Sequence, residues 1–336
     1  MVSGPPTGLS FGGDGLERKG MKTENIVTLT MNPAIDMGVS VKEMMTEHKM
    51  RALKTRRDPG GGGINVARVL KRFGAEPLAI FPMGGPSGHM LERLVAAEEV
   101  RHQSFMIARD CRANFTANDL SSGQQFRFVM PGPTLGEEEW TAGLGLTTAA
   151  SSSGFSVASG SLPRGVPHDF YARLARNLRV SGGARLVLDT SGPPLKHALD
   201  VGCYLVKPSL SEFTDLIGDT PDQKACHDAA KNLVINGKAE IVALTMGADG
   251  AMLVSRDVSI YAKPPPVQVN GTVGAGDSFV ALLILSLAER KGLRDAFRMA
   301  IAGGCAALLS PGTGLASPDV VNQLAPQVEV KDIAVA

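Results

Sequence analysis

Short apolar runs alternate with longer segments of helical periodicity along most of the chain. The apolar runs predict buried strands at 26–30, 78–81, 155–158, 186–188, 205–206 and 241–245. Between them, amphipathic helices are predicted at 65–73, 90–98, 169–180 and 227–236. Buried strands that alternate with helices indicate βαβ units and an α/β fold with a mostly parallel sheet. Ligands are then expected at the carboxyl ends of the strands.

Two segments break this pattern, because they combine polar residues and β-formers without a helical stripe. They cover about 36–57 and 114–130, and the second reads as a hairpin around Ser121, Ser122 and Gly123. We expect both segments to form a small accessory sheet that acts as a lid. The longest apolar run, 279–288, is about half the ~20 residues of a membrane span and predicts a buried helix.

Composition narrows the class of protein. Residues 1–22 are rich in Gly and Pro and predict a disordered extension, so the folded domain should cover 23–336. The 336 residues are 43% hydrophobic and 20% charged, and the net charge of +1 lacks the basic excess of a nucleic-acid binder. The four cysteines lie far apart without zinc-site spacing, which indicates reduced thiols in the cytoplasm.

The run from 270 to 278, NGTVGAGDS, places three glycines just before a strongly apolar helix. Unpaired N–H groups at a helix N-terminus attract anions, and small residues let a phosphate approach. We therefore expect Gly274, Ala275 and Gly276 to form an anion hole. Asp277 would lie in the first turn and accept the proton of an attacking hydroxyl. The alternative is a Gly-rich turn that is merely capped by Asp277.

The four glycines at 60–63 form a second candidate site. Consecutive glycines are costly in backbone entropy, so they suit a place where the backbone approaches a ligand closely, although a flexible loop is the alternative. Asn65 follows early in the next helix and could hydrogen-bond sugar hydroxyls. Asp36, just after the first strand, could bind vicinal hydroxyls or cap a turn.

Ser209 and Glu212 have the spacing of a capping box, which is the favoured interpretation on spacing alone. Glu212 could instead orient a metal-bound water near phosphates. Basic residues on the accessory strands could bind a phosphate or be solvated surface charges; they are Lys49, Arg51, Arg112 and Arg127. The six histidines show no metal-site spacing and receive no role.

Together, the Gly-rich run at 60–65 and the GAGD run at 274–277 resemble the two signatures of the PfkB family of carbohydrate kinases. The resemblance implies the ribokinase-like fold, a three-layer α/β/α sandwich with a small β-sheet lid. Within the family, GGGGINVAR, QFRFVMPG, SGSLPRGV, VKPSLSE and TVGAGDS are most similar to the minor bacterial-type 6-phosphofructokinases.

The resemblance also implies an activity and a set of site residues. MgATP would phosphorylate the 1-hydroxyl of fructose 6-phosphate, with Asp277 as the base, and a homodimer would form through the lid. Residues implied to bind the sugar phosphate are Asp36, Gly60, Gly61, Asn65, Lys49, Arg112 and Ser161. Residues implied to lie around ATP are Lys207, Ser209, Glu212, Thr245, Gly247, Thr272 and Gly274, with Glu212 reaching Mg²⁺ through water.

Three departures from the family pattern bear on the substrate and the metal. Ser209 replaces the Asn of the family's Asn-x-x-Glu motif, and the family's usual Ser-Leu-Gly run reads Thr245-Met246-Gly247 here. Ala34 stands where the minor phosphofructokinases have Ser, a form also seen in 1-phosphofructokinases and tagatose-6-phosphate kinases. Tagatose 6-phosphate and fructose 1-phosphate therefore stay open as substrates, although the Gly62-Gly63 pair argues against fructose 1-phosphate.

Two further alternatives come from other functional classes. A non-catalytic sugar-phosphate sensor on a kinase fold has only Ser209 in its favour, and a pure binder has no need of Asp277. A Rossmann dehydrogenase is disfavoured because no GxGxxG opens the helix after the first strand.

Overall fold

A computed structural model describes residues 24–218, 222–310 and 314–333, so the prediction of disorder for 1–22 lies outside the described residues. Its main sheet has ten strands in the order β14-β13-β12-β11-β10-β9-β8-β1-β4-β5. The strands from β11 through β5 are all parallel, which confirms the predicted mostly parallel sheet. The parallel strands are β11 (Ala239–Thr245), β10 (Cys203–Val206), β9 (Arg185–Asp189), β8 (Phe155–Ser159), β1 (Ile26–Leu29), β4 (Leu78–Met83) and β5 (Arg101–Met106).

Three antiparallel strands extend the sheet beyond β11, and the sequence pattern did not predict them. They are β12 (Ala251–Ser255), β13 (Ser259–Ala262) and β14 (Lys331–Asp332). Short turns connect β11 to β12 and β12 to β13, so neither connection carries the helix that signals a βαβ unit.

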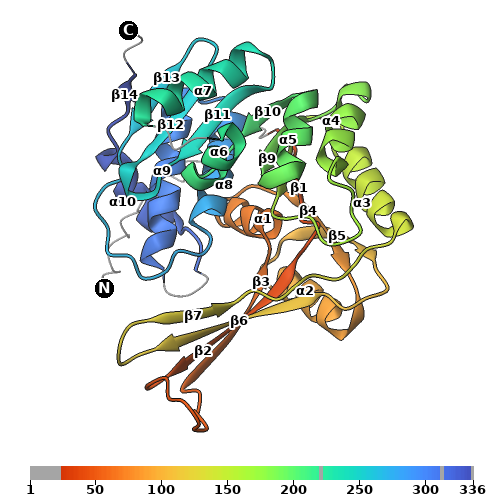
Figure 1. The fold of residues 1–336 in the computed structure, drawn as a ribbon, viewed down its shortest axis with the longest axis vertical. Helices are drawn as coiled ribbons and strands as arrows, with labels where there is room; N and C mark the ends of the chain where they lie inside the picture. The colour runs from red at the N-terminus through yellow and green to blue at the C-terminus, as the bar shows by residue number, and fades with distance from the viewer. Residues whose placement is uncertain (1–23, 219–221, 311–313, 334–336) are drawn as a thin grey trace, which may run out of the picture.

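Helices cover both faces of the main sheet (Figure 1). One face packs against α1 (Gly62–Arg72), α2 (Gly85–Ala97), α8 (Ala275–Ala288), α9 (Leu293–Leu309) and α10 (Pro318–Leu324). The other packs against α3 (Glu137–Ala150), α4 (Phe170–Val180), α5 (Gly192–Val201), α6 (Leu210–Ile217) and α7 (Gln223–Ile235). Two short 3₁₀ turns, η1 (Gly247–Asp249) and η2 (Ala325–Gln327), complete the described elements.

Neighbouring residues of a strand divide between the two helical layers. In β11, Ile241 and Ala243 join one core, whereas Val242 and Leu244 join the other. A strand that is buried on both faces is apolar at successive positions, which is why these strands appear as short continuous runs in the sequence. The three-layer α/β/α sandwich is therefore confirmed. The run 279–288 is confirmed as a buried helix, because α8 is buried from Ser278 to Ala288.

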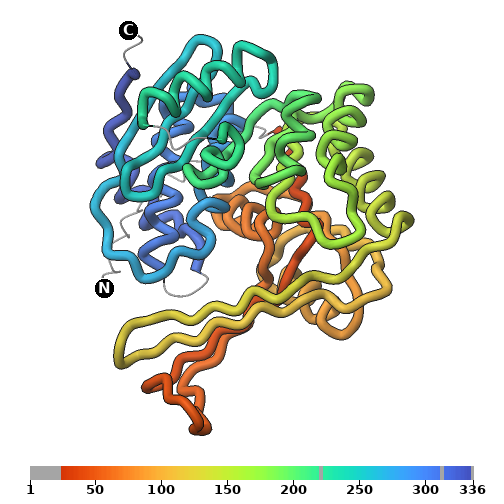
Figure 2. The backbone as a smooth tube through the Cα atoms, viewed as in Figure 1, coloured from red at the N-terminus to blue at the C-terminus, as the bar shows by residue number. Residues whose placement is uncertain are grey.

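The two segments that lacked a helical stripe form a separate four-stranded sheet in the order β3-β2-β6-β7. Its strands are β2 (Ala34–Val41), β3 (Lys54–Gly60), β6 (Arg112–Asp119) and β7 (Gln125–Phe128). The sheet projects from the body as an arm, and the backbone trace shows it leaving the body beside α1 and α2 (Figure 2). The predicted hairpin turns at Gly123, which has a φ of 71°.

Candidate active site

The N-terminus of α8 is an open helix end. Its N-cap is Gly274, which has a φ of 78° and offers no side-chain oxygen to the first N–H groups. A Cβ on this residue would lie 2.4 Å from Leu315 Cδ2, so both the conformation and the space favour glycine. The uncapped N–H groups and the positive end of the helix dipole are suited to binding an anion. The structure therefore brings the GAGD run to a helix N-terminus, as predicted.

Asp277 lies in the first turn of α8, where three other polar side chains converge. Asn65 Nδ2 donates to Asp277 Oδ2 at 2.9 Å. Lys207 Nζ pairs with Asp189 Oδ1 at 3.0 Å, and the same nitrogen would lie 3.7 Å from a Cβ placed on Gly276. The charges of both carboxylates act on this one nearly buried ammonium group.

This environment raises the pKa of Asp277 from its ordinary 3.8 to about 7. Burial is the largest cause, and the negative charge of Asp189 adds to it, while the Asn65 hydrogen bond and the Lys207 charge oppose the rise. Burial alone would lower the pKa of Lys207, but the carboxylates around it, Asp189 first, raise it above its ordinary value. A carboxyl group with a pKa near neutrality is well matched to general-base catalysis.

The four glycines at 60–63 allow close packing rather than a flexible loop, and the last two belong to α1. A Cβ on Gly62 would lie 2.0 Å from Ser159 Oγ, and one on Gly63 would lie 2.5 Å from the carbonyl oxygen of Leu29. These contacts set the start of α1 directly against the carboxyl ends of β8 and β1. A Cβ on Gly60 would lie 2.3 Å from Asp36 Oδ2, so this glycine leaves room for the Asp36 carboxylate.

Asp36 stands at the root of the small sheet and is held there by Asn114, whose Nδ2 donates to Asp36 Oδ1 at 2.8 Å. Burial raises the pKa of Asp36, against the effects of Asn114 and Arg112. Arg112 Nη2 donates to the carbonyl oxygen of Asn32 at 2.9 Å, and Asn32 Nδ2 donates to Ser161 Oγ at 3.2 Å. The structure therefore brings together three of the predicted sugar-phosphate residues, Asp36, Arg112 and Ser161.

Two buried polar atoms in this group have no hydrogen-bond partner among the described residues: Arg112 Nε, a donor, and Asn32 Oδ1, an acceptor. Buried polar atoms are nearly always paired in folded proteins. A ligand that presents both an anionic oxygen and a hydroxyl group matches this pair of atoms.

Lys49 and Arg51 are not brought to this group within one chain. In the register of the small sheet, Asp36 pairs with Asp58 near the body, whereas Ser40 pairs with Lys54 at the distal end. Lys49 is exposed on the loop beyond that pair, which forms the lowest tip of the arm in Figure 1. Arg127, on β7, is close enough for its charge to lower the pKa of Asp36.

Ser209 and Glu212 form the capping box that their spacing predicted. Ser209 is the N-cap of α6, its backbone N–H donates to Glu212 Oε2 at 2.7 Å, and Glu212 N–H donates to Ser209 Oγ at 3.3 Å. Thr245 lies beside this cap, because its N–H donates to the carbonyl oxygen of Pro208 at 3.0 Å. Of the remaining predicted ATP residues, Gly247 opens η1 with a φ of 59°, and Thr272 is exposed just before Gly274.

The described residues include no cluster of three or more His, Cys, Asp or Glu side chains arranged to hold a metal ion. Mg²⁺ in kinases typically uses one or two carboxylates together with waters and substrate phosphates. Glu212 fits that mode, since its negative charge acts on Lys207 and its capping bond uses only Oε2. None of the described helices combines the length and apolar character that crossing a bilayer requires.

Sequence reasoning missed four residues of this site: Asp189, Arg68, Asn114 and Asn32. Asp189 ends strand β9, so the argument that singled out Asp36 at a strand's carboxyl end applies equally to it. Asn114 and Asn32 act through contacts between distant segments, such as the 78 residues that separate Asn114 from Asp36. Arg68 lies one helical turn after Asn65 and bonds to it, but its charge partner Glu98 is 30 residues away. Local spacing gives no signal for such contacts.

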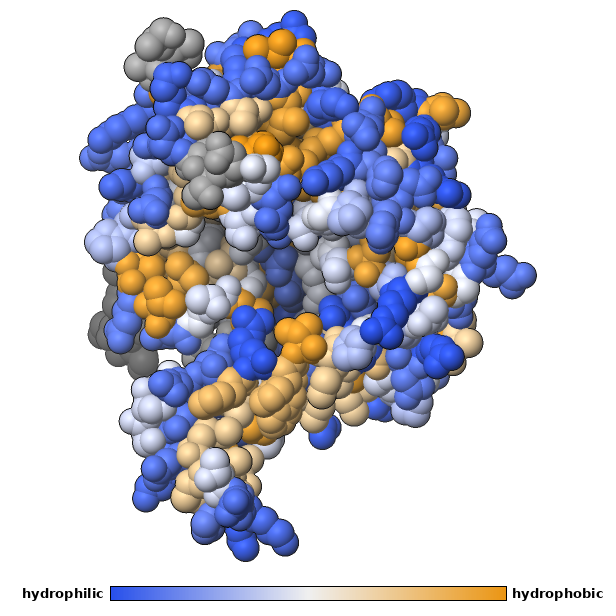
Figure 3. Space-filling model, in the orientation of Figure 1, coloured by the Kyte–Doolittle hydropathy of each residue, from blue (hydrophilic) through white to orange (hydrophobic). Residues whose placement is uncertain are grey.

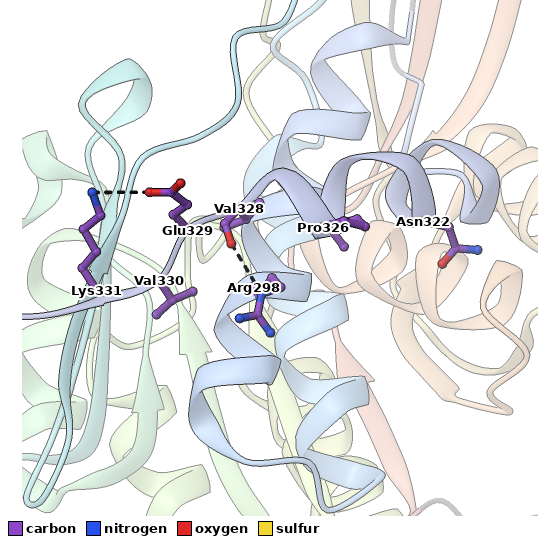
Figure 4. A pocket seen from close by; sticks show the side chains of 8 residues that line it. Arg298, Asn322, Pro326, Val328, Glu329, Val330 and Lys331 are labelled. Carbon is purple, nitrogen blue, oxygen red and sulfur yellow. Dashed lines mark hydrogen bonds and ion pairs between the residues drawn. The ribbon is translucent and has the colours of Figure 1, made fainter.

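A surface cavity of about 710 Å³ lies elsewhere, beside α9 and the segment that follows α10 (Figure 4). Its two cationic side chains already have partners. Arg298 Nε donates to the carbonyl oxygen of Val328 at 3.4 Å, and Lys331 Nζ lies 3.4 Å from Glu329 Oε2. The convergent acidic and basic groups of the α8 site, rather than this cavity, carry the features expected of a reaction centre.

Comparison with known proteins agrees with this geometry. The sequence model described as "pfkB family carbohydrate kinase" matches residues 26–320. The ATP-dependent 6-phosphofructokinase isozyme 2 of Mycobacterium tuberculosis is 41% identical over 303 residues, which cover 89% of this chain and 88% of that protein. The 1-phosphofructokinase of Bacillus subtilis is 32% identical over 307 residues, which cover 91% of this chain and 99% of that protein.

The fold is also found among solved structures. The crystal structure of phosphofructokinase-2 from Escherichia coli in complex with potassium is similar with a TM-score of 0.86 and 36% sequence identity. The similarity covers 90% of this chain and 98% of that chain.

Proposed function

Because the chain belongs to the pfkB family of carbohydrate kinases, we propose that it transfers the γ-phosphoryl group of ATP to the 1-hydroxyl of fructose 6-phosphate. The observation that carries the proposal is Asp277 at the uncapped N-terminus of α8, with a pKa of about 7. A base and an anion-binding helix end in the same turn are what transfer of a phosphoryl group to a hydroxyl requires.

In the proposed reaction, the sugar hydroxyl oxygen forms a bond to the γ-phosphorus while the bond from that phosphorus to the β–γ bridging oxygen breaks. The hydroxyl proton passes to the Asp277 carboxylate, and ADP leaves. The N–H groups at the start of α8 and the Lys207 ammonium stabilise negative charge on the transferred group. Glu212 would hold Mg²⁺ through water, and the metal would supply charge neutralisation on the ATP oxygens.

The sugar end of the site is formed where the small sheet meets the body. In this proposal, Asp36 accepts hydrogen bonds from sugar hydroxyls, while Arg112 and Ser161 bind the 6-phosphate or its neighbouring hydroxyls. The unpaired Arg112 Nε supports this assignment, since it is a buried cationic donor without a protein partner among the described residues. The higher identity to the 6-phosphofructokinase than to the 1-phosphofructokinase favours fructose 6-phosphate over fructose 1-phosphate.

A panel of sugars with MgATP and coupled detection of ADP tests the substrate directly. We expect the highest kcat/KM for fructose 6-phosphate. A clear preference for tagatose 6-phosphate or fructose 1-phosphate would keep the kinase and replace the substrate. Binding of a sugar phosphate without turnover of any sugar would overturn the kinase proposal in favour of a sensor.

We further propose a cytoplasmic homodimer that joins through the small sheet, which also acts as the lid. Large apolar side chains are exposed on this sheet and its connecting segments, and Figure 3 shows hydrophobic residues spread along the arm. They include Leu53, Leu120, Phe126, Phe128, Val129 and Met130. An exposed apolar face of this kind favours association with another surface. In such a dimer, the distal Lys49 would serve the site of the second copy.

Phe128→Glu tests this assembly, because Phe128 is 51% exposed on β7. We expect light scattering to show a monomer, and kinetics to show a raised KM for the sugar phosphate. Val180→Glu is the matched control, since Val180 is 90% exposed at the end of α4, outside the small sheet. Equal behaviour of the two variants would contradict the lid-mediated dimer.

A further inference from the structure

Arg68 is a buried arginine on α1 that does not touch the reacting groups yet connects to the base through one residue. Only 1% of the residue is exposed. Its Nε donates to Glu98 Oε1 at 2.9 Å, and its Nη2 also bonds to that oxygen. Its Nη1 donates to the carbonyl oxygen of Pro59 at 3.0 Å and to Asn65 Oδ1 at 3.1 Å. The guanidinium group therefore joins Asn65, one turn earlier in α1, to the end of β3 at Pro59 and to Glu98, which follows α2.

The bond from Arg68 determines which way the amide of Asn65 faces. A guanidinium group can only donate hydrogen bonds, so the atom of Asn65 that meets it must be the carbonyl oxygen. The NH₂ group is then directed to the other side, where it donates to Asp277 Oδ2 at 2.9 Å. With the amide reversed, two donors would face each other at Arg68, and the amide oxygen would face the Asp277 carboxylate. Both contacts would be repulsive.

We propose that Arg68 is a positioning residue for the reaction: it fixes the amide of Asn65 so that its NH₂ group donates to the Asp277 carboxylate. The inference rests on the proposed role of Asp277 as the base. It goes beyond that role because it assigns the orientation of the base to a residue one contact further from the substrate.

The surroundings of Arg68 show why an arginine suits this position. Glu98 neutralises the buried charge together with Asp58, whose Oδ1 lies 3.8 Å from Nη2. Arg72 holds the second oxygen of Glu98 at 3.1 Å, so the ion pair with Glu98 is itself anchored. Burial would raise the pKa of Glu98, but hydrogen bonds and charge from Arg68, and then from Arg72, lower it, so Glu98 stays ionised. A lysine could satisfy Glu98, but one ammonium nitrogen lacks the planar fork that reaches Pro59 and Asn65 at the same time.

The consequence for Asp277 has a definite sign. The Asn65 bond lowers the pKa of Asp277, against burial and the charge of Asp189. Without Arg68, the Asn65 amide is free to turn, the donor is lost and the pKa rises. Loss of a hydrogen bond to a charged group corresponds to a rise in pKa of ~1–2 pH units. More of the base is then protonated at neutral pH.

The experiment measures the pKa of Asp277 in the full chain by ¹³C-carboxyl NMR, with ¹³C-labelled aspartate. The signal of Asp277 is identified as the one that is missing from the spectrum of Asp277→Asn. We compare the wild-type chain, Arg68→Lys, Arg68→Met and Arg72→Met. Both Arg68 variants should titrate ~1 pH unit higher than wild type. The acid limb of their kcat/KM profiles should move by the same amount. Arg68→Lys is included because it keeps a charge for Glu98 and with it a partner for the buried carboxylate.

Arg72→Met is the matched control. It removes the other arginine of Glu98 without touching Asn65, so it should lower the melting temperature while leaving the Asp277 titration and the acid limb unchanged. An unchanged Asp277 titration in Arg68→Lys would overturn the proposal and reduce Arg68 to a structural ion pair. The NMR titration needs no turnover, so a wild-type chain that phosphorylates no sugar would refute the proposed function separately.

Discussion

The helices α6 and α8 both begin beside Lys207, and they begin in opposite ways. At α6, Ser209 and Glu212 satisfy the free backbone donors through a reciprocal capping box. At α8, the N-cap is Gly274, which has no side chain to offer. Both helices have the same dipole and the same surplus of N–H groups. One helix end is stabilised from within the protein, whereas the other is left to be completed by a ligand.

This difference separates residues that stabilise the fold from residues that serve the reaction. A change at the capped end should appear first in the free energy of unfolding. A change at the open end should appear first in turnover or in the affinity for ATP. Four measurements test this division, and the largest expected effect comes first.

Asp277→Asn removes the proposed base from the open helix end but keeps a side chain of nearly the same size. Loss of general-base catalysis typically costs 10²–10⁴-fold, so we expect kcat to fall by about 10³-fold. Sugar-phosphate binding, measured by calorimetry, should change little. Turnover close to that of the wild-type chain would remove Asp277 from the mechanism.

The pH dependence of kcat/KM should show an acid limb at the pKa of Asp277, about 7 in the free protein. The base acts in its ionised form, so activity falls roughly tenfold for each pH unit below that value. The free energy of unfolding should fall as pH rises, whereas activity should increase. The folded state binds this proton more tightly than the unfolded chain, whose carboxyl has the ordinary value of 3.8, so ionisation destabilises the fold.

Wild-type stability should therefore lose the Asp277 contribution as pH rises from about 4 to about 7, and Asp277→Asn should escape this loss. Thermal unfolding of both proteins at pH 5 and pH 8 checks the sign. Relative to the wild-type chain, the variant should gain melting temperature between pH 5 and pH 8. The absence of such a gain would argue against a raised pKa of Asp277.

Gly274→Ala should weaken ATP binding and lower stability. The alanine would have to adopt the φ of 78° and place its Cβ 2.4 Å from Leu315 Cδ2. A left-handed conformation costs a residue with a Cβ about 1–2 kcal/mol before any displacement of Leu315. Gly292→Ala is the control, because Gly292 is the N-cap of α9 with a φ of −64° and open space around it. The control should leave the KM for ATP unchanged.

Glu212→Gln and Ser209→Ala should separate the two roles considered for the capped end. Glutamine can still accept the Ser209 N–H bond, so stability should change by less than ~0.5 kcal/mol, while loss of the charge should raise the Mg²⁺ requirement about tenfold. Ser209→Ala should cost about 1 kcal/mol of stability with little effect on Mg²⁺. Titration of activity with Mg²⁺ and chemical unfolding measure the two effects. The reverse pattern would make Glu212 purely a cap.

The main elements of the fold could be predicted from sequence because its strands are buried on both faces. Strands such as Phe155–Ser159 are short continuous apolar runs, and helices such as Phe170–Val180 carry a clear apolar stripe. The edge strand β5 was missed, since Arg101–Met106 contains a single buried residue, Phe105. The fully buried β12 was missed for another reason: its turn to β13 replaces the helix that marks the other strands.

The residues of the candidate site also divide into those that the sequence could predict and those that it could not. Glycine runs and Asp277 could be found because local backbone geometry requires particular residues at particular spacings. The contact between Asn65 and Asp277 spans 212 residues, and each residue was singled out from its own motif before the fold joined them. The role of Arg68 could not be predicted, because it depends on simultaneous hydrogen bonds to Pro59, Asn65 and Glu98. No single sequence motif contains all three partners.

The way the chain enters and leaves the small sheet has a mechanical consequence. Four residues separate the end of β1 at Leu29 from the start of β2 at Ala34, and β3 ends at Gly60, just before α1 begins at Gly62. Two of the four crossings between the body and the arm therefore pass through Asn32, Gly60 and Gly61, beside Asp36 and Arg112. A rotation of the arm as one body would bend the chain at these places, so its hinge would share residues with the proposed sugar site. A sugar bound there would then stiffen the hinge, and any partner that fixes the tip of the arm would change the fit of the sugar.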